Sequence, residues 1–278
     1  MQVIRHMKAA QFLARAKAWL ETAEAENNLI LGNSTSFETA PEPWTIEPYL
    51  LTVEHEKNLF SAALMTPPHH LVISRSQDLA LRTLADWLLS EQVDISGVLG
   101  PQLEAKTFAD YWVNKTGKQL RAGLPQRIYA CSLIVEPSNT DGLLRRAANE
   151  DAELLLHWCR QFVIETGVPE SVEEYSTAVP NKIRDGNLYV WEDGQVVSMA
   201  GLSGKTQHGI RVNLVYTPPH LRKKGYATSC VAALTQRMLD SGKSFCCLYT
   251  DLTNPTSNSI YQKIGYRPVC DVQDWVFE

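Results

Sequence analysis

The chain has 278 residues, of which 44% are hydrophobic and 21% are charged, and its net charge at pH 7 is −5. This composition predicts a folded protein large enough for two domains, and it excludes an intrinsically disordered chain. The acidic charge argues against a nucleic-acid partner, and no apolar run is long enough to span a membrane. Six scattered cysteines, with no CxxC pair, predict reduced thiols in a cytoplasmic protein without a metal site.

The first segment, residues 2–20, is basic and has a helical pattern. A mitochondrial transit peptide has a similar composition. However, residues 2–20 contain no serine, and the pattern continues past Glu21. The segment is therefore predicted to be the first helix of the folded protein.

The N-terminal half alternates short apolar runs with helical patterns. The predicted order is a hairpin of strands 49–53 and 59–65, a strand over 71–74, a helix over 77–91, a strand over 95–99, a helix over 102–116 and a strand over 126–135. Residues 136–142, EPSNTDG, are typical of a linker. They predict one domain over 1–137 and a second over 138–278.

The C-terminal half repeats this order of elements. The predicted elements are a hairpin of strands 188–191 and 196–202, a strand over 210–217, a helix from 226, a strand over 245–250, a short helix over 257–264 and a last strand that starts with residues 266–269. The shared order predicts a duplicated architecture.

The segment 212–238 carries the clearest chemical signal. Pro218 and Pro219 end an apolar strand, because proline cannot donate a backbone hydrogen bond. The basic residues Arg222, Lys223 and Lys224 then precede a glycine and a helix. Free N–H groups at a helix N-terminus, beside basic side chains, form an anion site, and a diphosphate is the natural guest. The loop has neither the GxxxxGK[ST] nor the GxGxxG pattern of the commonest nucleotide sites.

A second segment, residues 245–269, reads FCCLYTDLTNPTSNSIYQKIGYRPV. Together the two segments resemble the GNAT acetyltransferase superfamily, whose acyl-coenzyme A loop has the pattern [QR]-x-x-G-x-[GA]. The second family pattern, N-x-x-[AS]-x-x-[LI]-Y-x-x-x-G-[FY], is matched by Asn254, Ser257, Ile260, Tyr261, Gly265 and Tyr266. The motifs cover residues 210–270, and the similarity is to two-part predicted GNAT acetyltransferases and to relatives in the glycine N-acyltransferase-like group.

The resemblance implies the GNAT fold, an α/β (α+β) fold with a mixed twisted sheet flanked by helices, preceded here by a degenerate GNAT-like half. It also implies that acetyl-CoA binds between the strands 210–217 and 245–250. The residues implied in binding are Leu214, Val215 and Tyr216 for the pantetheine arm, Arg222, Lys223, Lys224, Gly225, Tyr226, Ala227 and Thr228 for the pyrophosphate, and Asn254 and Ser257 from the facing strand.

The family's general-acid position is occupied by Tyr261, whose hydroxyl would protonate the departing thiolate. The alternative for Tyr261 is that it only packs the short helix onto the sheet. No base stands out. Asp251 is a candidate that is also placed to cap a turn, and the adjacent pair His69-His70 is poor evidence for a metal site.

The two halves differ where acyl-CoA would bind. The N-terminal helix over 77–91 is preceded by no glycine and carries Asp78 where an anion would dock. An acid at a helix N-terminus already satisfies the helix dipole. The N-terminal half is therefore predicted to shape the site and not to bind a second acyl-CoA.

The function expected from the resemblance is acetyl transfer from acetyl-CoA to a primary amine of a small molecule or peptide, by a monomer or homodimer without nucleic-acid or membrane partners. The alternative is a non-catalytic acyl-CoA sensor. The acceptor site is expected in residues 150–186 and 203–209, with a possible contribution from the N-terminal half, and these segments carry no recognisable motif.

Overall fold

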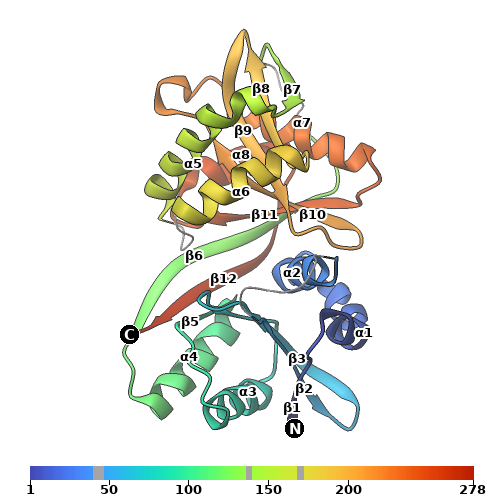
Figure 1. Cartoon of the computed structure of the whole chain (residues 1–278), viewed down its shortest axis with the longest axis vertical. Coiled ribbons are helices and arrows are strands. Elements are labelled where there is room, and N and C mark those ends of the chain that lie inside the picture. The colour runs from blue at the N-terminus through green and yellow to red at the C-terminus, as the bar shows by residue number, and fades with distance from the viewer. Residues whose placement is uncertain (40–46, 136–139, 168–171) are drawn as a thin grey trace.

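The strands of the computed structural model, which describes residues 1–39, 47–135, 140–167 and 172–278, form one mixed, mostly antiparallel sheet (Figure 1). Its strand order is β1-β2-β3-β4-β5-β12-β6-β11-β10-β9-β8-β7. The two halves of the chain form two lobes that follow one another along this sheet. The expected mixed sheet with flanking helices is confirmed.

The N-terminal half begins with a strand. Its elements are β1 (Gln2–Arg5), α1 (Ala9–Leu20), α2 (Asn28–Thr39), β2 (Tyr49–His55), β3 (Asn58–Met65), β4 (Leu71–Ile73), α3 (Asp78–Ser90), β5 (Gly97–Pro101), α4 (Gln102–Thr116) and β6 (Leu120–Cys131). The prediction of a single helix over 2–20 is wrong at its start. Val3 and Ile4 pair with β2, which suits β-branched side chains, and the helix begins only at Ala9.

The C-terminal half follows the predicted order and adds an edge strand. Its elements are β7 (Leu143–Arg146), α5 (Ala152–Thr166), α6 (Val172–Arg184), β8 (Leu188–Asp193), β9 (Gln195–Ser203), β10 (Gly209–Tyr216), α7 (Tyr226–Asp240), β11 (Phe245–Asp251), α8 (Pro255–Ile264) and β12 (Arg267–Phe277). β12 starts within the predicted segment 266–269 and continues to Phe277.

The last strand of each half is exchanged with the other half. β6 pairs antiparallel with β11 of the C-terminal half, from Gln126 to Cys131. β12 pairs antiparallel with β5 of the N-terminal half, and β6 and β12 also pair with each other. The pairing of β12 explains its length, and pairing with β12 also moves the start of β6 from the expected residue 126 to Leu120. The division at residue 137 stays a prediction, because 136–139 lie outside the described residues.

Helices cover both faces of the sheet in each half. In the C-terminal half, α7 packs on one face through residues such as Leu234, and α5 and α6 pack on the other through residues such as Leu155 and Val179. In the N-terminal half, α3 and α4 share one core, and α1 and α2 share a second. Helix α2 also approaches the C-terminal half, where a Cβ on Gly32 would lie 2.6 Å from the Cα of Gly204. This contact sets α2 against the loop between β9 and β10.

Candidate functional site

The parallel strands β10 and β11 part from each other after a short paired stretch. They pair only from Gly209 to Arg211, opposite Phe245 to Cys247. Beyond Arg211, β10 stays paired with β9 but shifts register before Tyr216, and Leu214 adopts a φ of 50°. This bulge turns β10 away from β11. The gap leaves the β11-facing edge of β10 available to an extended amide chain.

The loop after β10 leads directly to the N-terminus of α7. A short 3-10 helix, Pro219–Leu221, follows Pro218, and α7 begins at Tyr226. Within the part of the chain that the structure describes, no group accepts a hydrogen bond from the backbone N–H of residues 223–228. Such amides, with the positive end of the α7 dipole, attract an anion. A pyrophosphate at this position stays a prediction.

Gly225 is required by the shape of this loop. Its φ is 87°, in the left-handed region that glycine adopts without strain. A Cβ at this position would also lie 2.8 Å from Cγ2 of Thr140. The Thr140 and Ser229 hydroxyls form a hydrogen bond beside it, so the neighbouring chain is held close. The loop therefore has no room for a side chain at residue 225.

Arg222 does not point freely toward the loop amides. Its Nε donates to the carbonyl oxygen of Thr217 at 2.8 Å, and its NH2 group donates to Glu165 at 2.5 Å. The guanidinium also lies 5.6 Å from the ring centre of Tyr216, whose hydroxyl donates to Glu165. The loop's unpaired positive charge therefore comes from the exposed Lys223 and Lys224. Glu165 was not identified from the sequence, since it lies 57 residues from Arg222.

Arg222→Glu is expected to weaken acetyl-CoA binding several-fold at low salt. The substitution places a negative charge at the loop and removes the partner of Glu165, and the effect shrinks as salt screens exposed charges. Calorimetric titrations at two ionic strengths measure it. Arg82→Glu on α3 is the control, because Arg82 forms a similar exposed ion pair with Asp78, 3.0 Å away, in the other half. Equal loss in both variants, or no dependence on salt, would contradict the prediction.

Tyr261 lies on α8, which begins after Asn254. The side-chain oxygen of Asn254 accepts from the N–H of Ser257 at 3.1 Å and so caps the helix. Tyr261 is buried and packs edge-on against Tyr266, with ring centres 5.9 Å apart. Burial raises the pKa of Tyr261 to about 12. The hydroxyl is therefore protonated at neutral pH, as a general acid requires, and its packing also agrees with the alternative of a purely structural role.

Three acidic or histidine side chains of the C-terminal half have partners of their own. Asp251 accepts from the N–H of Thr253 at 2.8 Å, so it caps the turn after β11. Glu192 forms an ion pair with Arg145 at 2.8 Å. His208 lies 2.7 Å from Glu24 through Nδ1. Over the ranges that the structure describes, no three metal-binding side chains gather at one place.

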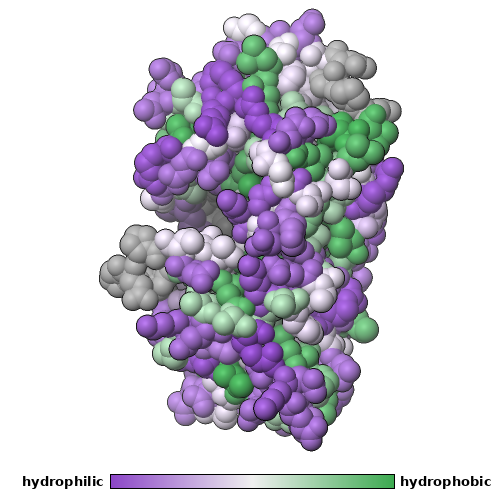
Figure 2. Space-filling view, turned by 90° about the vertical axis from the view of Figure 1, so that its right-hand side faces the viewer, coloured by the Kyte–Doolittle hydropathy of each residue, from purple (hydrophilic) through white to green (hydrophobic). Residues whose placement is uncertain are grey.

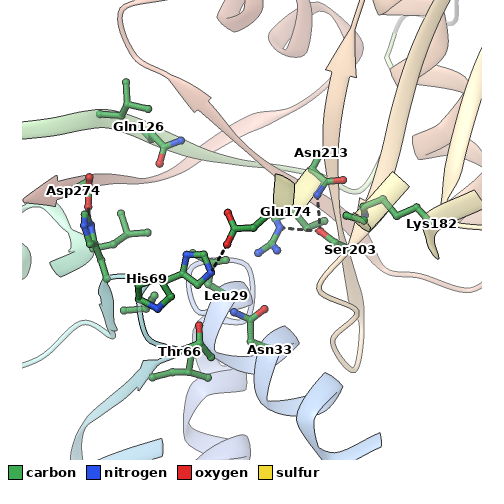
Figure 3. A pocket seen from close by; sticks show the side chains of 18 residues that line it. Leu29, Asn33, Thr66, His69, Gln126, Glu174, Lys182, Ser203, Asn213 and Asp274 are labelled. Carbon is green, nitrogen blue, oxygen red and sulfur yellow. Dashed lines mark hydrogen bonds and ion pairs between the residues drawn. The ribbon is translucent and has the colours of Figure 1, made fainter. Parts of the chain in front are cut away.

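A cavity of about 700 Å³ lies between the two halves. Its walls come from α2, α6, the ends of β9 and β10, the loop before β4, and the exchanged strands β6 and β12 (Figure 3). The side chains lining it include Asn33, His69, Gln126, Glu174, Lys182, Ser203, Arg211, Asn213 and Asp274. The surface view of one side of the molecule also shows a recess between the lobes (Figure 2).

Contacts between histidines and carboxylates join distant parts of the chain at this cavity. His69 of the N-terminal half lies 3.3 Å from Glu174 of α6, and His70 lies 2.5 Å from Asp274 of β12. In the sequence the two histidines simply follow a Pro-Pro turn. No neighbouring residue indicates that their partners are Glu174 and Asp274. Lys182 and Arg211 were likewise not identified, because their proximity arises only from the packing of α6 against the end of β10.

Comparison with known proteins agrees with this geometry. Residues 192–276 match the model of the FR47-like protein family. A structure of a Drosophila protein has a TM-score of 0.68 at 13% identity, covering 99% of this chain and 97% of that chain. A GCN5-related N-acetyltransferase from Sphaerobacter thermophilus has a TM-score of 0.61 at 13% identity, with coverages of 99% and 95%. A tandem GNAT protein from the clavulanic acid biosynthesis pathway has a TM-score of 0.56 at 12% identity, with coverages of 99% and 97%.

The chain has the fold of GNAT proteins, with the two-part arrangement of a tandem GNAT protein. Its residues 192–276 are similar to the FR47-like family. No curated protein matches the sequence. None of the described helices is both long and apolar enough to cross a bilayer.

Proposed function

We propose that the protein transfers an acetyl group from acetyl-CoA to a primary amine. The observation that carries the proposal is the gap between β10 and β11 followed by the loop amides of residues 223–228, which donate to no group of the described residues. Coenzyme A would suit this arrangement, because its pantetheine arm is an extended amide chain with a pyrophosphate at one end. Backbone groups of the protein would bind both parts. The pantetheine arm would pair with the backbone at Leu214, Val215 and Tyr216, and the pyrophosphate would bind around Gly225.

The remaining predicted contacts come from the loop and from the facing strand. The amides of Tyr226, Ala227 and Thr228, at the first turn of α7, would bind the pyrophosphate with those of Lys223 and Lys224. Arg222 would contribute to pyrophosphate binding only through its charge and not through direct contact, since its guanidinium is paired with Glu165. Asn254 and Ser257 would face the pantetheine arm from the start of α8, with the free amide nitrogen of Asn254 as a donor.

Acetyl transfer forms a C–N bond to the amine as the C–S bond of the thioester breaks. The amine must lose a proton to a base or to water, because a typical alkylamine is protonated at neutral pH. The departing thiolate must gain a proton, and Tyr261 would supply it. A thiol has an ordinary pKa of about 8.5. Burial raises the pKa of Tyr261 to about 12, so its hydroxyl carries this proton at neutral pH.

The cavity between the halves is the proposed acceptor site. Arg211 and Asn213 of β10 line it, and they immediately precede the bulge where β10 leaves β11. An amine in the cavity could therefore reach an acyl group held in the gap. The N-terminal half supplies the facing wall, through α2 and the loop before β4. This arrangement supports a substrate-shaping role for that half.

Release of free thiol from acetyl-CoA in the presence of an amine library tests this function. Calorimetry with acetyl-CoA alone is run in parallel. Thiol release that depends on both an amine and the protein supports acetyl transfer. Binding without release for any amine would favour the alternative of a sensor, and absence of binding would remove both functions.

One acetyl-CoA is expected to bind per chain. The N-terminal loop before α3 contains no glycine, and Arg75 within it is held by Glu26 at 3.0 Å and faces Glu104 at 3.7 Å. Asp78 opens α3 and repels an anion. The stoichiometry from a calorimetric titration measures this, and a value near two would show that the N-terminal half also binds acetyl-CoA.

A further inference from the structure

One end of the acceptor cavity holds two cationic side chains without an acidic partner. The Arg211 guanidinium donates to Asn28 Oδ1 at 3.0 Å and to Ser203 Oγ at 3.3 Å. Lys182 Nζ donates to the carbonyl oxygen of Leu202 at 2.6 Å. Neither forms an ion pair with a carboxylate of the described residues. Figure 3 shows Lys182, Ser203 and Asn213 together at this end of the cavity.

Without a bound anion, these two neighbouring cations destabilise the folded protein. Burial, together with the smaller effect of the nearby positive charge of Arg211, lowers the pKa of Lys182 to about 8. Other partly buried arginines of the fold are neutralised. Arg145, for example, binds both Asp151 and Glu192. Buried charges without partners are disfavoured, so a persistent pair of cations indicates a site for an anion.

The two cations keep free donors at this end, and the buried Asn213 Oδ1 is an acceptor without a partner among the described residues. Arg211 uses two of its five N–H groups in the contacts above, and Lys182 uses one of three. Ser203 Oγ accepts from both Arg211 and Asn213, which leaves its own proton to donate. A planar carboxylate, with two acceptor oxygens, matches an arginine fork with a second cation beside it.

The position of these groups relates the anion to the proposed reaction. Arg211 is the last β10 residue paired with β11, so a carboxylate bound to it lies where the two strands part. The cavity continues from there to His70 and Asp274 on the opposite wall. A volume of about 700 Å³ is larger than an acceptor the size of glycine needs.

We propose that the acceptor is an amine that carries a carboxylate, that Arg211 and Lys182 bind this carboxylate, and that the rest of the acceptor extends between the two halves toward His70 and Asp274. This inference rests on the proposed acetyl transfer, and it names the chemical class of the substrate.

The test compares acceptors that differ only in charge. Amino acids and dipeptides are assayed beside their C-terminal amides, by thiol release from acetyl-CoA and, without acetyl-CoA, by thermal shift. The acids are expected to have KM values at least about ten-fold lower than those of their amides, the effect of one charge-assisted contact. Dipeptides and amino acids with large side chains are expected to bind better than glycine.

Variants locate the effect. Lys182→Met and Arg211→Gln are expected to remove the preference for acids while the Kd for acetyl-CoA is unchanged, and Arg211→Lys is expected to restore part of it. Arg184→Met is the matched control, because Arg184 is an exposed residue of α6 that pairs with Asp185 at 3.0 Å. Lys182→Met is expected not to lower Tm, since it removes a buried unpaired charge.

The outcomes separate this inference from the proposed function. Acids and amides consumed equally well would overturn the carboxylate site and leave acetyl transfer standing. The carboxylate site would also be overturned if neither thermal shift nor thiol release shows a preference for acids over amides. This outcome counts whether or not acetyl-CoA binds. Preference for acids that survives in both Lys182→Met and Arg211→Gln would place the carboxylate elsewhere.

Discussion

Gly225→Val is expected to abolish acetyl-CoA binding while the fold is retained. The substitution forces a β-branched residue into a φ of 87° and places Cβ 2.8 Å from the Thr140 methyl group. The loop must shift, and its amides then no longer converge on a single phosphate group. A loss of at least about 100-fold in affinity is expected from several lost charge-assisted contacts, each contributing about 1.5–3 kcal/mol. Calorimetry measures the affinity, and circular dichroism measures the fold.

Gly242→Val is the matched control for this prediction. Gly242 lies just after the other end of α7, has a similar φ of 95°, and has open space around an added Cβ. The control variant therefore suffers the same backbone strain, about 1–2 kcal/mol, without a change in the loop. It is expected to lower Tm and to keep wild-type affinity. Wild-type affinity in Gly225→Val as well would show that this loop does not bind the pyrophosphate.

Tyr261→Phe is expected to lower turnover by about 10²–10⁴-fold, the usual contribution of a general acid. The Kd for acetyl-CoA is expected to stay nearly unchanged, because the ring still fills its place against Tyr266. Steady-state rates of thiol release and calorimetry measure the two quantities. The pKa of Tyr261 near 12 adds a second expectation: between pH 6 and 10, no loss of wild-type activity should come from ionisation of this hydroxyl.

Tyr266→Phe distinguishes chemistry from packing. Tyr266 is buried beside Tyr261, and its hydroxyl forms a hydrogen bond of 2.7 Å with Thr235. Loss of that bond is expected to destabilise the fold by about 1 kcal/mol and to leave turnover intact. If both variants keep full activity, Tyr261 has only the packing role that its position also allows.

The sequence was most informative where function depends on a few neighbouring residues. The strand, the loop with Gly225 and the helix α7 are contiguous, so their order and the free amides could be predicted from residues 212–238. The same holds for α8, which was predicted over 257–264 and begins two residues earlier, at Pro255, after its cap Asn254. The order of elements from β2 to β6 and from β8 to β12 was also predicted, because periodic apolar patterns are local.

Features that depend on distant residues could not be predicted in this way. The partner of Arg222 lies 57 residues away, and that of His70 lies 204 residues away. Helix α2, rich in Asn, Ser and Thr, has little intrinsic helical preference and is stabilised by burial of residues such as Ile30. The acceptor cavity combines both halves, so no segment of sequence could reveal its walls.

The exchange of β6 and β12 means that cutting the polypeptide between its halves would not release two self-sufficient units. A fragment containing β11 but lacking β6 would expose a long row of unpaired backbone groups, the kind of edge on which chains aggregate. Its counterpart lacking β12 would expose β5 in the same way. Each fragment carries the strand that the other lacks, so the two fragments are expected to associate and restore the sheet when they are mixed.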